Sequence, residues 1–143
     1  MENYITYFDQ NFLLQGLALH DSLRRHQPDS VLWVLCLDEK VEQQLALLHP
    51  EGLKTISLHS VETPELLESK KNRSRTEYVF TLTPFVYEFV FSRDPLIDRV
   101  TYLDADVYFF SDPMRLLGAF IESDKSVFLT EHAFDQRYER LVV

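Results

Sequence analysis

Apolar runs alternate with helical patterns along the first half of the chain. A continuous apolar run occurs at Val31–Leu37, and a short run rich in aromatic and β-branched residues occurs at Tyr4–Phe8; both are typical of strands in an α/β sheet. Leu53–Leu58 has the pattern of a third, weaker strand. Between them, apolar positions recur at helical spacing from Phe12 to His26 and again from Val41 to Leu48. Because strands that alternate with helices build β-α-β units, we expect a mainly parallel sheet between two helical layers.

The second half of the chain continues the pattern with less regular spacing. Polar residues 60–76 surround a short helix expected over Pro64–Glu68. Thr83 followed by Pro84 has the form of an N-cap and a first-turn proline, which predicts a helix from there to about Phe91. The other expected elements are a buried strand over Val100–Leu103, its strand-like continuation over Val107–Phe110, a helix that Asp112 and Pro113 open and that runs to about Phe120, and a strand over Val127–Thr130.

Composition and charge narrow the class of protein. The 143 residues are 45% hydrophobic, which is enough for a packed core, and with no linker or repeat in view we expect residues 1–143 to form a single domain. A formal charge of −9 argues against nucleic acid and against an anionic membrane surface as partners. No apolar run is long enough for a transmembrane helix, and the first residues lack the charged region of a signal peptide. The single cysteine, Cys36, suits a reducing compartment, so we expect a cytoplasmic protein with a buried structural thiol.

Glycine is scarce, and this limits how the chain could bind a phosphate. The three glycines, Gly16, Gly52 and Gly118, cannot form a glycine-rich phosphate loop. An acidic chain without such a loop needs another source of positive charge to neutralise a phosphate compound.

Acidic residues follow three of the expected strands, at the edge where open α/β sheets bind ligands. The strongest signal is Asp104 and Asp106, since residues i and i+2 of an extended segment point to the same side. Two carboxylates that share a small volume repel each other unless a cation lies between them. Mg²⁺ or Mn²⁺ fits, because these ions combine one or two carboxylates with waters and phosphate oxygens. The alternative is that one aspartate caps a turn while the other is solvated.

The stretch Arg99–Pro113, which contains Asp104-Ala-Asp106, resembles the D-x-D segment of GT-A-fold glycosyltransferases, particularly family 8-like enzymes. Residues 4–12 with Gly16 and Ser22 are similar to the first strand and helix of these enzymes, and Arg75–Pro84 is similar to their stretch before the D-x-D segment. The resemblance implies a Rossmann-like GT-A fold with three α/β/α layers. It also implies a hexosyltransferase-like enzyme that takes a nucleoside-diphosphate sugar, with a UDP-sugar favoured, and transfers the sugar to an unknown acceptor.

The resemblance further implies roles for individual residues. Asp104 and Asp106 would hold Mn²⁺ or Mg²⁺, and the catalytic residues stay unassigned. His132 is expected to line the sugar pocket. The nucleotide-sugar contacts would come from Thr6, Tyr7, Phe8, Asp38, Arg75, Thr81, Thr83, Asp104, Ala105 and Asp106.

The chain also departs from the family. The family's third metal ligand, usually a histidine, and its acceptor region lie beyond a length of 143 residues, so we expect an amino-terminal or truncated part of a longer transferase. An edge of the sheet left open in this way could pair with a second copy to form a homodimer. The basic residues Lys70, Lys71, Arg73 and Arg75 form either a solvated loop or a cover over a diphosphate.

Two other functions stay open. A non-catalytic module that binds nucleotide sugars is one, because the acceptor region is absent. A haloacid-dehalogenase-type phosphatase is the other, with Asp104 as nucleophile and Asp106 as general acid. That family's motif follows the first strand, however, and no adjacent acidic pair follows Asp106 here.

Overall fold

The structure, a computed structural model, describes residues 1–123, 125 and 127. The chain divides into two compact units, Met1–Asp112 and Pro113–Val143. In chain order the elements of the first unit are β1 (Asn3–Phe8), η1 (Gln10–Phe12), α1 (Leu13–His26), β2 (Val31–Cys36), α2 (Glu39–Leu48), β3 (Leu53–Ser57), α3 (Leu58–Val61), α4 (Pro64–Lys70), α5 (Arg75–Arg93) and β4 (Thr101–Tyr102). In the second unit the structure describes α6 (Met114–Glu122).

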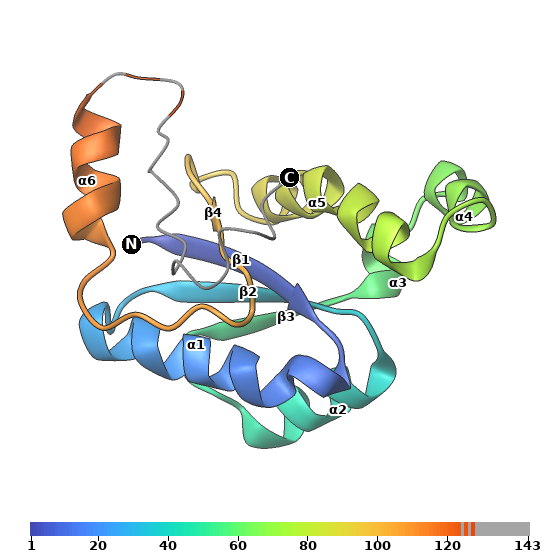
Figure 1. Ribbon diagram of the computed structural model, residues 1–143, viewed down its shortest axis with the longest axis horizontal. Coiled ribbons are helices and arrows are strands. Elements are labelled where there is room, and N and C mark those ends of the chain that lie inside the picture. Colours follow the sequence, from blue (N-terminus) through green and yellow to red (C-terminus); the bar gives the residue numbers. More distant parts are fainter. Residues whose placement is uncertain (124, 126, 128–143) are drawn as a thin grey trace, which may run out of the picture. The chain divides into compact units, whose positions relative to one another are not determined.

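The first unit is an α/β fold with an all-parallel sheet, as the sequence predicts. Its strands lie in the order β3-β2-β1-β4, and β1 pairs with β2 in a register that sets Ile5 opposite Trp33. Helices α1 and α2 lie on one face of the sheet, and α3 and α5 lie on the other (Figure 1). This arrangement gives the three α/β/α layers of a Rossmann-like fold.

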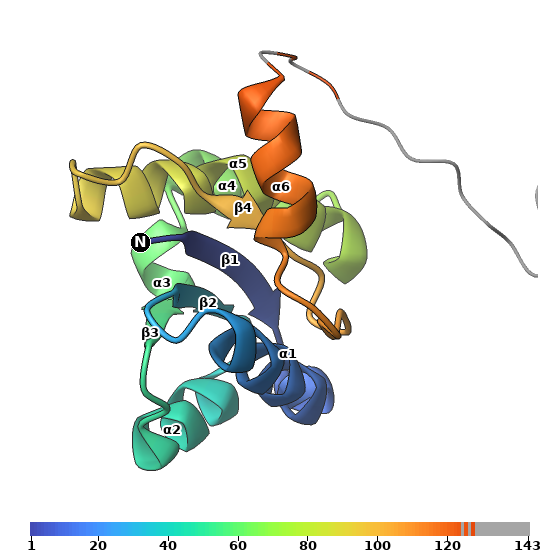
Figure 2. The same cartoon turned by 90° about the vertical axis from the view of Figure 1, so that its left-hand side faces the viewer.

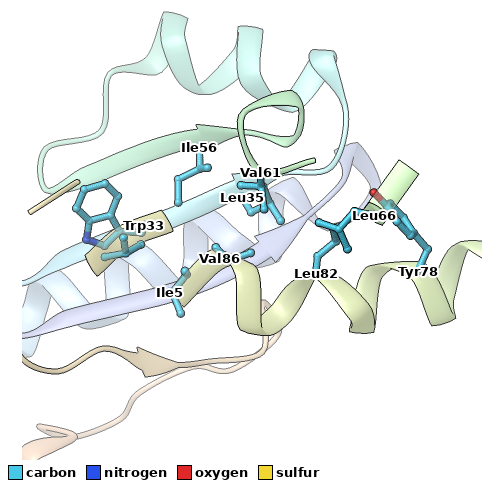
Figure 3. Close-up of a cluster of buried hydrophobic side chains, with 10 residues drawn as sticks. Ile5, Trp33, Leu35, Ile56, Val61, Leu66, Tyr78, Leu82 and Val86 are labelled. Carbon is cyan, nitrogen blue, oxygen red and sulfur yellow. The ribbon is translucent and has the colours of Figure 1, made fainter. Parts of the chain in front are cut away.

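The core on the α5 face joins the sheet to the helices that cover it. Side chains of β1, β2 and β3 meet side chains of α3, α4 and α5 there (Figure 3). The cluster consists of Ile5, Trp33, Leu35, Ile56, Val61, Leu66, Tyr78, Leu82, Val86 and Val90. On the opposite face Cys36 is buried, and burial raises the pKa of its thiol to about 12, which confirms a buried structural cysteine.

Helix α5 differs from the prediction at its start. It begins at Arg75 rather than near Thr83, because Ser74 and Glu77 form a reciprocal capping box. Pro84, expected in the first turn, lies inside the helix. The helix continues through this proline because buried residues at four-residue spacing hold it on the sheet, from Tyr78 and Leu82 to Val86 and Val90.

Three expectations for the last third of the chain also need correction or cannot be assessed. Residues 107–110 form no strand, since β4 ends at Tyr102 and the chain then turns. The second-unit helix begins at Met114 with Pro113 at the N-cap position, one residue later than predicted, and Pro113 provides no side-chain cap. Of the predicted strand 127–130 only Val127 is described, outside any element, and His132 lies outside the described residues.

None of the helices among residues 1–123 is both long and apolar enough to cross a membrane.

Candidate functional site

A pocket of about 430 Å³ lies at the carboxyl edge of the sheet in the first unit. The ends of β1, β2 and β4 border it together with the first turns of α5. Its lining residues are Tyr7, Phe8, Asp9, Phe12, Leu37, Arg75, Thr76, Val79, Phe80, Tyr102, Asp104, Ala105 and Asp106.

The strand order explains why a pocket forms at this place. After β1, the chain adds β2 and β3 along one edge of β1, whereas β4 pairs with the other edge of β1. Figure 2 shows β4 beside β1 with α5 above them. The connections that leave neighbouring strands β1 and β4 therefore diverge, and such a switch point is where open α/β sheets form ligand crevices.

The segment Asp104–Asp106 reaches the pocket in a different conformation from the one predicted. The extended geometry expected for it is wrong, because the backbone turns here and the Val107 N–H donates to the Asp104 carbonyl at 3.1 Å. Ala105 is buried, while Asp104 and Asp106 are exposed and both line the pocket. The turn brings the two aspartates to one site, although the i, i+2 argument does not apply.

Asp104 has a hydrogen-bond partner at the pocket wall. The Tyr102 hydroxyl donates to Asp104 Oδ1 at 2.9 Å, and the Tyr102 ring lies 5.3 Å from the Tyr7 ring, centroid to centroid. Burial, followed by the neighbouring Tyr7 and by the hydrogen bond to Asp104, raises the pKa of Tyr102 above its ordinary value. The phenol therefore keeps its proton at neutral pH and acts as a donor to the carboxylate.

Arg75 brings a positive charge to the pocket and is already paired. Its Nη2 lies 2.7 Å from Asp9 Oδ2, and Asp9 Oδ1 also accepts from the Asn11 N–H at the start of η1. Three carboxylates and one guanidinium line the pocket, so its formal charge is −2. An anionic ligand would enter this pocket favourably only together with a cation.

Four predicted nucleotide-sugar residues are not among the residues that line the pocket. Thr6 is completely buried in β1, and its Oγ1 has no hydrogen-bond partner among the described residues. Asp38 is the N-cap of α2 and accepts from the backbone N–H groups of Val41 and Gln10. Thr81 accepts a hydrogen bond from Arg73 and donates to the Glu77 carbonyl, and Thr83 lies farther along α5.

The pKa of Asp38 agrees with this capping role. Burial alone would raise it, but backbone N–H donors from Gln10, Val41 and Lys40 outweigh burial and hold the pKa below its usual range. The carboxylate of Asp38 thus stabilises the start of α2.

Aromatic side chains form much of the pocket wall, and beyond the predicted Tyr7 and Phe8 they include three that the sequence did not predict. Phe12 and Phe80 line it while 47% and 66% exposed, and Tyr102 lines it from β4. The helical pattern could have indicated an exposed Phe80. Phe80 precedes Leu82 by two residues and therefore lies off the buried stripe of α5.

The basic residues between Lys70 and Arg75 differ in what they contact. Lys70 pairs with Glu62 at 2.7 Å, and Lys71 pairs with Glu68. Of the four basic residues in this run, Arg75 is the one that lines the pocket.

The donor set suits a divalent cation in part. Asp104 and Asp106 present two exposed carboxylates to the pocket, and Mg²⁺ or Mn²⁺ accepts such a pair when waters and phosphate oxygens complete the coordination. Among the described residues, no group of three or more His, Cys, Asp or Glu side chains could hold a metal by itself. The residues present therefore fit a cation that arrives with a phosphate ligand better than a cation held by protein alone.

The chain is similar to two Bacillus subtilis proteins. It is 34% identical to the uncharacterized protein YfnF of strain 168 over 110 residues, which are 77% of this chain and 36% of YfnF. It is 33% identical to the uncharacterized protein YfnD of the same strain over 136 residues, which are 95% of this chain and 43% of YfnD. The chain thus spans less than half the length of these curated relatives. No family model matches the sequence.

Proposed function

We propose that this chain binds a nucleoside-diphosphate sugar together with a divalent cation, as the donor-binding part of a glycosyltransferase. The observation that carries the proposal is the position of Asp104 and Asp106, which line a pocket at the switch point between β1 and β4. The sequence resemblance to the D-x-D segment of GT-A-fold enzymes supports the same assignment.

The pocket's own residues have distinct roles in this proposal. Asp104 and Asp106 hold the cation, and Arg75 provides a fork of N–H donors for diphosphate oxygens. Tyr7 and Phe8, at the end of β1, border the nucleoside. When bound, Mn²⁺ or Mg²⁺ supplies the Lewis-acid stabilisation that a departing diphosphate needs.

Transfer of the sugar to an acceptor belongs to the proposal for the whole protein. The chain corresponds to less than half of YfnF and YfnD, so we assign it donor binding and leave the acceptor unnamed. A pocket of about 430 Å³ is in the range of small-molecule sites.

Calorimetric titration with UDP, with and without Mn²⁺, tests the proposal. The expected result is that UDP binds more tightly by tenfold or more when Mn²⁺ is present, because the formal charge of −2 at the pocket repels the free diphosphate. Asp104→Asn and Asp106→Asn should each weaken the Mn²⁺-dependent binding of UDP by tenfold or more. Asp98→Asn is the matched control, because Asp98 is an exposed aspartate outside the pocket lining.

The same variants separate the proposal from its alternatives. If both aspartate variants bind UDP and Mn²⁺ as tightly as the unchanged protein, the cation site is wrong. Binding of a sugar nucleotide without hydrolysis or transfer would favour a non-catalytic module. Hydrolysis of p-nitrophenyl phosphate that depends on Asp104 would favour the phosphatase instead.

A further inference from the structure

We propose that Tyr102 is a positioning residue, whose hydroxyl fixes the orientation of the Asp104 carboxylate for a divalent cation. This inference rests on the proposed function, because it deepens the role of Asp104 in that site. Apart from Tyr102, the described residues provide no side-chain hydrogen bond that would hold the Asp104 carboxylate in one orientation.

The backbone leaves Asp104 beyond the support of the sheet. The β4 ladder ends at Tyr102, opposite Ile5, and the Leu103 N–H makes a further bond to the Ile5 carbonyl at 2.9 Å. Asp104 then opens a turn and is exposed. An exposed aspartate at a turn exchanges between rotamers, so its oxygens would have no fixed direction without a side-chain partner.

Tyr102 provides that partner from a fixed position. Its backbone pairs with β1, its ring contacts the Tyr7 ring, and its side chain packs against the buried cluster on the α5 face. The hydroxyl therefore reaches Asp104 Oδ1, at 2.9 Å, from a phenol that the core holds in place.

The hydrogen bond also gives the two carboxylate oxygens of Asp104 different roles. While Asp104 Oδ1 accepts a hydrogen bond from the Tyr102 hydroxyl, Oδ2 makes no hydrogen bond within the described residues and is free to bind a cation. Asp106 has no hydrogen-bonding side-chain partner of this kind among them, so the asymmetry points to Asp104 as the more firmly oriented ligand. Partners that orient a metal-binding carboxylate in this way commonly change metal affinity by 10–100-fold.

A competing explanation is that Tyr102 only fills the edge of the sheet. Tyr102→Phe distinguishes the two, because the ring stays while the hydrogen bond to Asp104 is lost. Tyr108→Phe is the matched control, since Tyr108 loses the same hydroxyl but is not a residue that lines the pocket. Thermal unfolding of both variants checks that the fold is retained.

Mn²⁺ affinity, measured by electron paramagnetic resonance with and without UDP, is the decisive quantity. We expect Tyr102→Phe to weaken Mn²⁺ binding about tenfold while Tyr108→Phe leaves it unchanged. The loss should persist in an Asp106→Asn background. A Tyr102→Phe/Asp104→Asn double variant should bind Mn²⁺ no more weakly than Asp104→Asn alone, because Tyr102 acts through Asp104.

The outcomes distinguish this inference from the proposed function. If Asp104→Asn weakens Mn²⁺ binding but Tyr102→Phe stays within twofold of the unchanged protein, the positioning role is overturned and the site stands. A further loss in the double variant, or a fall in thermal stability that accounts for the weaker binding, also overturns it. If neither aspartate variant changes Mn²⁺ binding, the proposed function itself fails.

Discussion

Arg75, the first residue of α5, lies 2.7 Å from Asp9, the residue that follows β1, although 66 positions separate them in sequence. The Arg75 side chain is 67% exposed, whereas that of Asp9 is 15% exposed. The more buried Asp9 carboxylate thus holds the more exposed Arg75 guanidinium at the pocket, where an anionic ligand can bind to it.

We expect Arg75→Met to weaken binding of UDP in the presence of Mn²⁺ by about tenfold. A hydrogen bond to a charged group contributes about 1.5–3 kcal/mol, which is a factor of ten or more in affinity. The free energy of unfolding should change by less than about 1 kcal/mol, because the guanidinium of the pair is exposed and Asp9 keeps its hydrogen bond from the Asn11 N–H. Calorimetric titration and chemical denaturation measure the two quantities.

Arg93→Met is the control for this change, since Arg93 lies at the other end of α5 and packs over the Phe89 ring at 4.9 Å. It should leave UDP affinity unaltered. Equal losses in the two variants would mean that α5 contributes only general positive charge, and no loss with Arg75→Met would remove Arg75 from the site.

The fold was largely predictable because its signals are local. A continuous apolar run predicted β2, since a strand covered by helices on both faces is apolar at nearly every position. Aromatic and β-branched residues predicted β1, and a weaker pattern predicted the edge strand β3, which keeps exposed Lys54 and Thr55. The start of α5 was not predicted, although Ser74-x-x-Glu77 is a readable capping box. Thr83-Pro84 gave a competing local signal, and tertiary burial of the helix decided between the two.

The candidate site was predictable only in part, because it depends on which strand ends become neighbours. Asp104 and Asp106 could be found from their place after a strand. The pairing of Arg75 with Asp9 and the contact of Tyr102 with Tyr7 depend on the strand order and on how α5 lies over the sheet. Thr6 was predicted to contact the nucleotide sugar but does not line the pocket. It precedes the pocket residue Tyr7 in β1 and is completely buried.

Gly16 allows α1 to approach β1 closely, and its replacement should disturb both the core and the pocket. A Cβ at this position would lie 2.5 Å from Cζ of Phe8, a buried ring that also lines the pocket. We expect Gly16→Ala to lower the free energy of unfolding by about 1–3 kcal/mol, measured by urea denaturation. Gly118→Ala is the control, because its Cβ would be in ordinary contact, 3.9 Å from Met114 Cε. An unchanged stability in Gly16→Ala would show that Phe8 can move without cost.

Pro84 lies inside α5, where it cannot donate a backbone hydrogen bond. We expect Pro84→Ala to raise the free energy of unfolding by about 1–3 kcal/mol, because an interior proline costs roughly 3 kcal/mol relative to alanine. Pro64→Ala is the matched control: Pro64 occupies the first turn of α4, where no helical N–H bond is lost, so no such gain should follow. Thermal and urea unfolding of the two variants provide the comparison, and a destabilised Pro84→Ala would contradict the prediction.

Glu62 should make the stability of the first unit depend on pH. Its side chain is 4% exposed and accepts from Tyr78 at 2.8 Å and from Lys70 at 2.7 Å. Burial alone would raise the pKa of Glu62, but these donors outweigh it and hold the pKa below its ordinary value.

A carboxylate with a lowered folded-state pKa stabilises the protein fully above its unfolded pKa, and this contribution is lost as the pH falls through the folded value. We therefore expect Glu62→Gln to cost about 1–3 kcal/mol at pH 7, measured by urea denaturation, because it weakens two hydrogen bonds to a charged group. The difference from the unchanged protein should shrink as the pH is lowered from 5 to 3. Glu68→Gln, in an exposed pair with Lys71, should show almost no difference at either pH. A cost for Glu62→Gln that stays constant between pH 7 and pH 3 would mean that packing, rather than the charge of Glu62, joins α4 to α5.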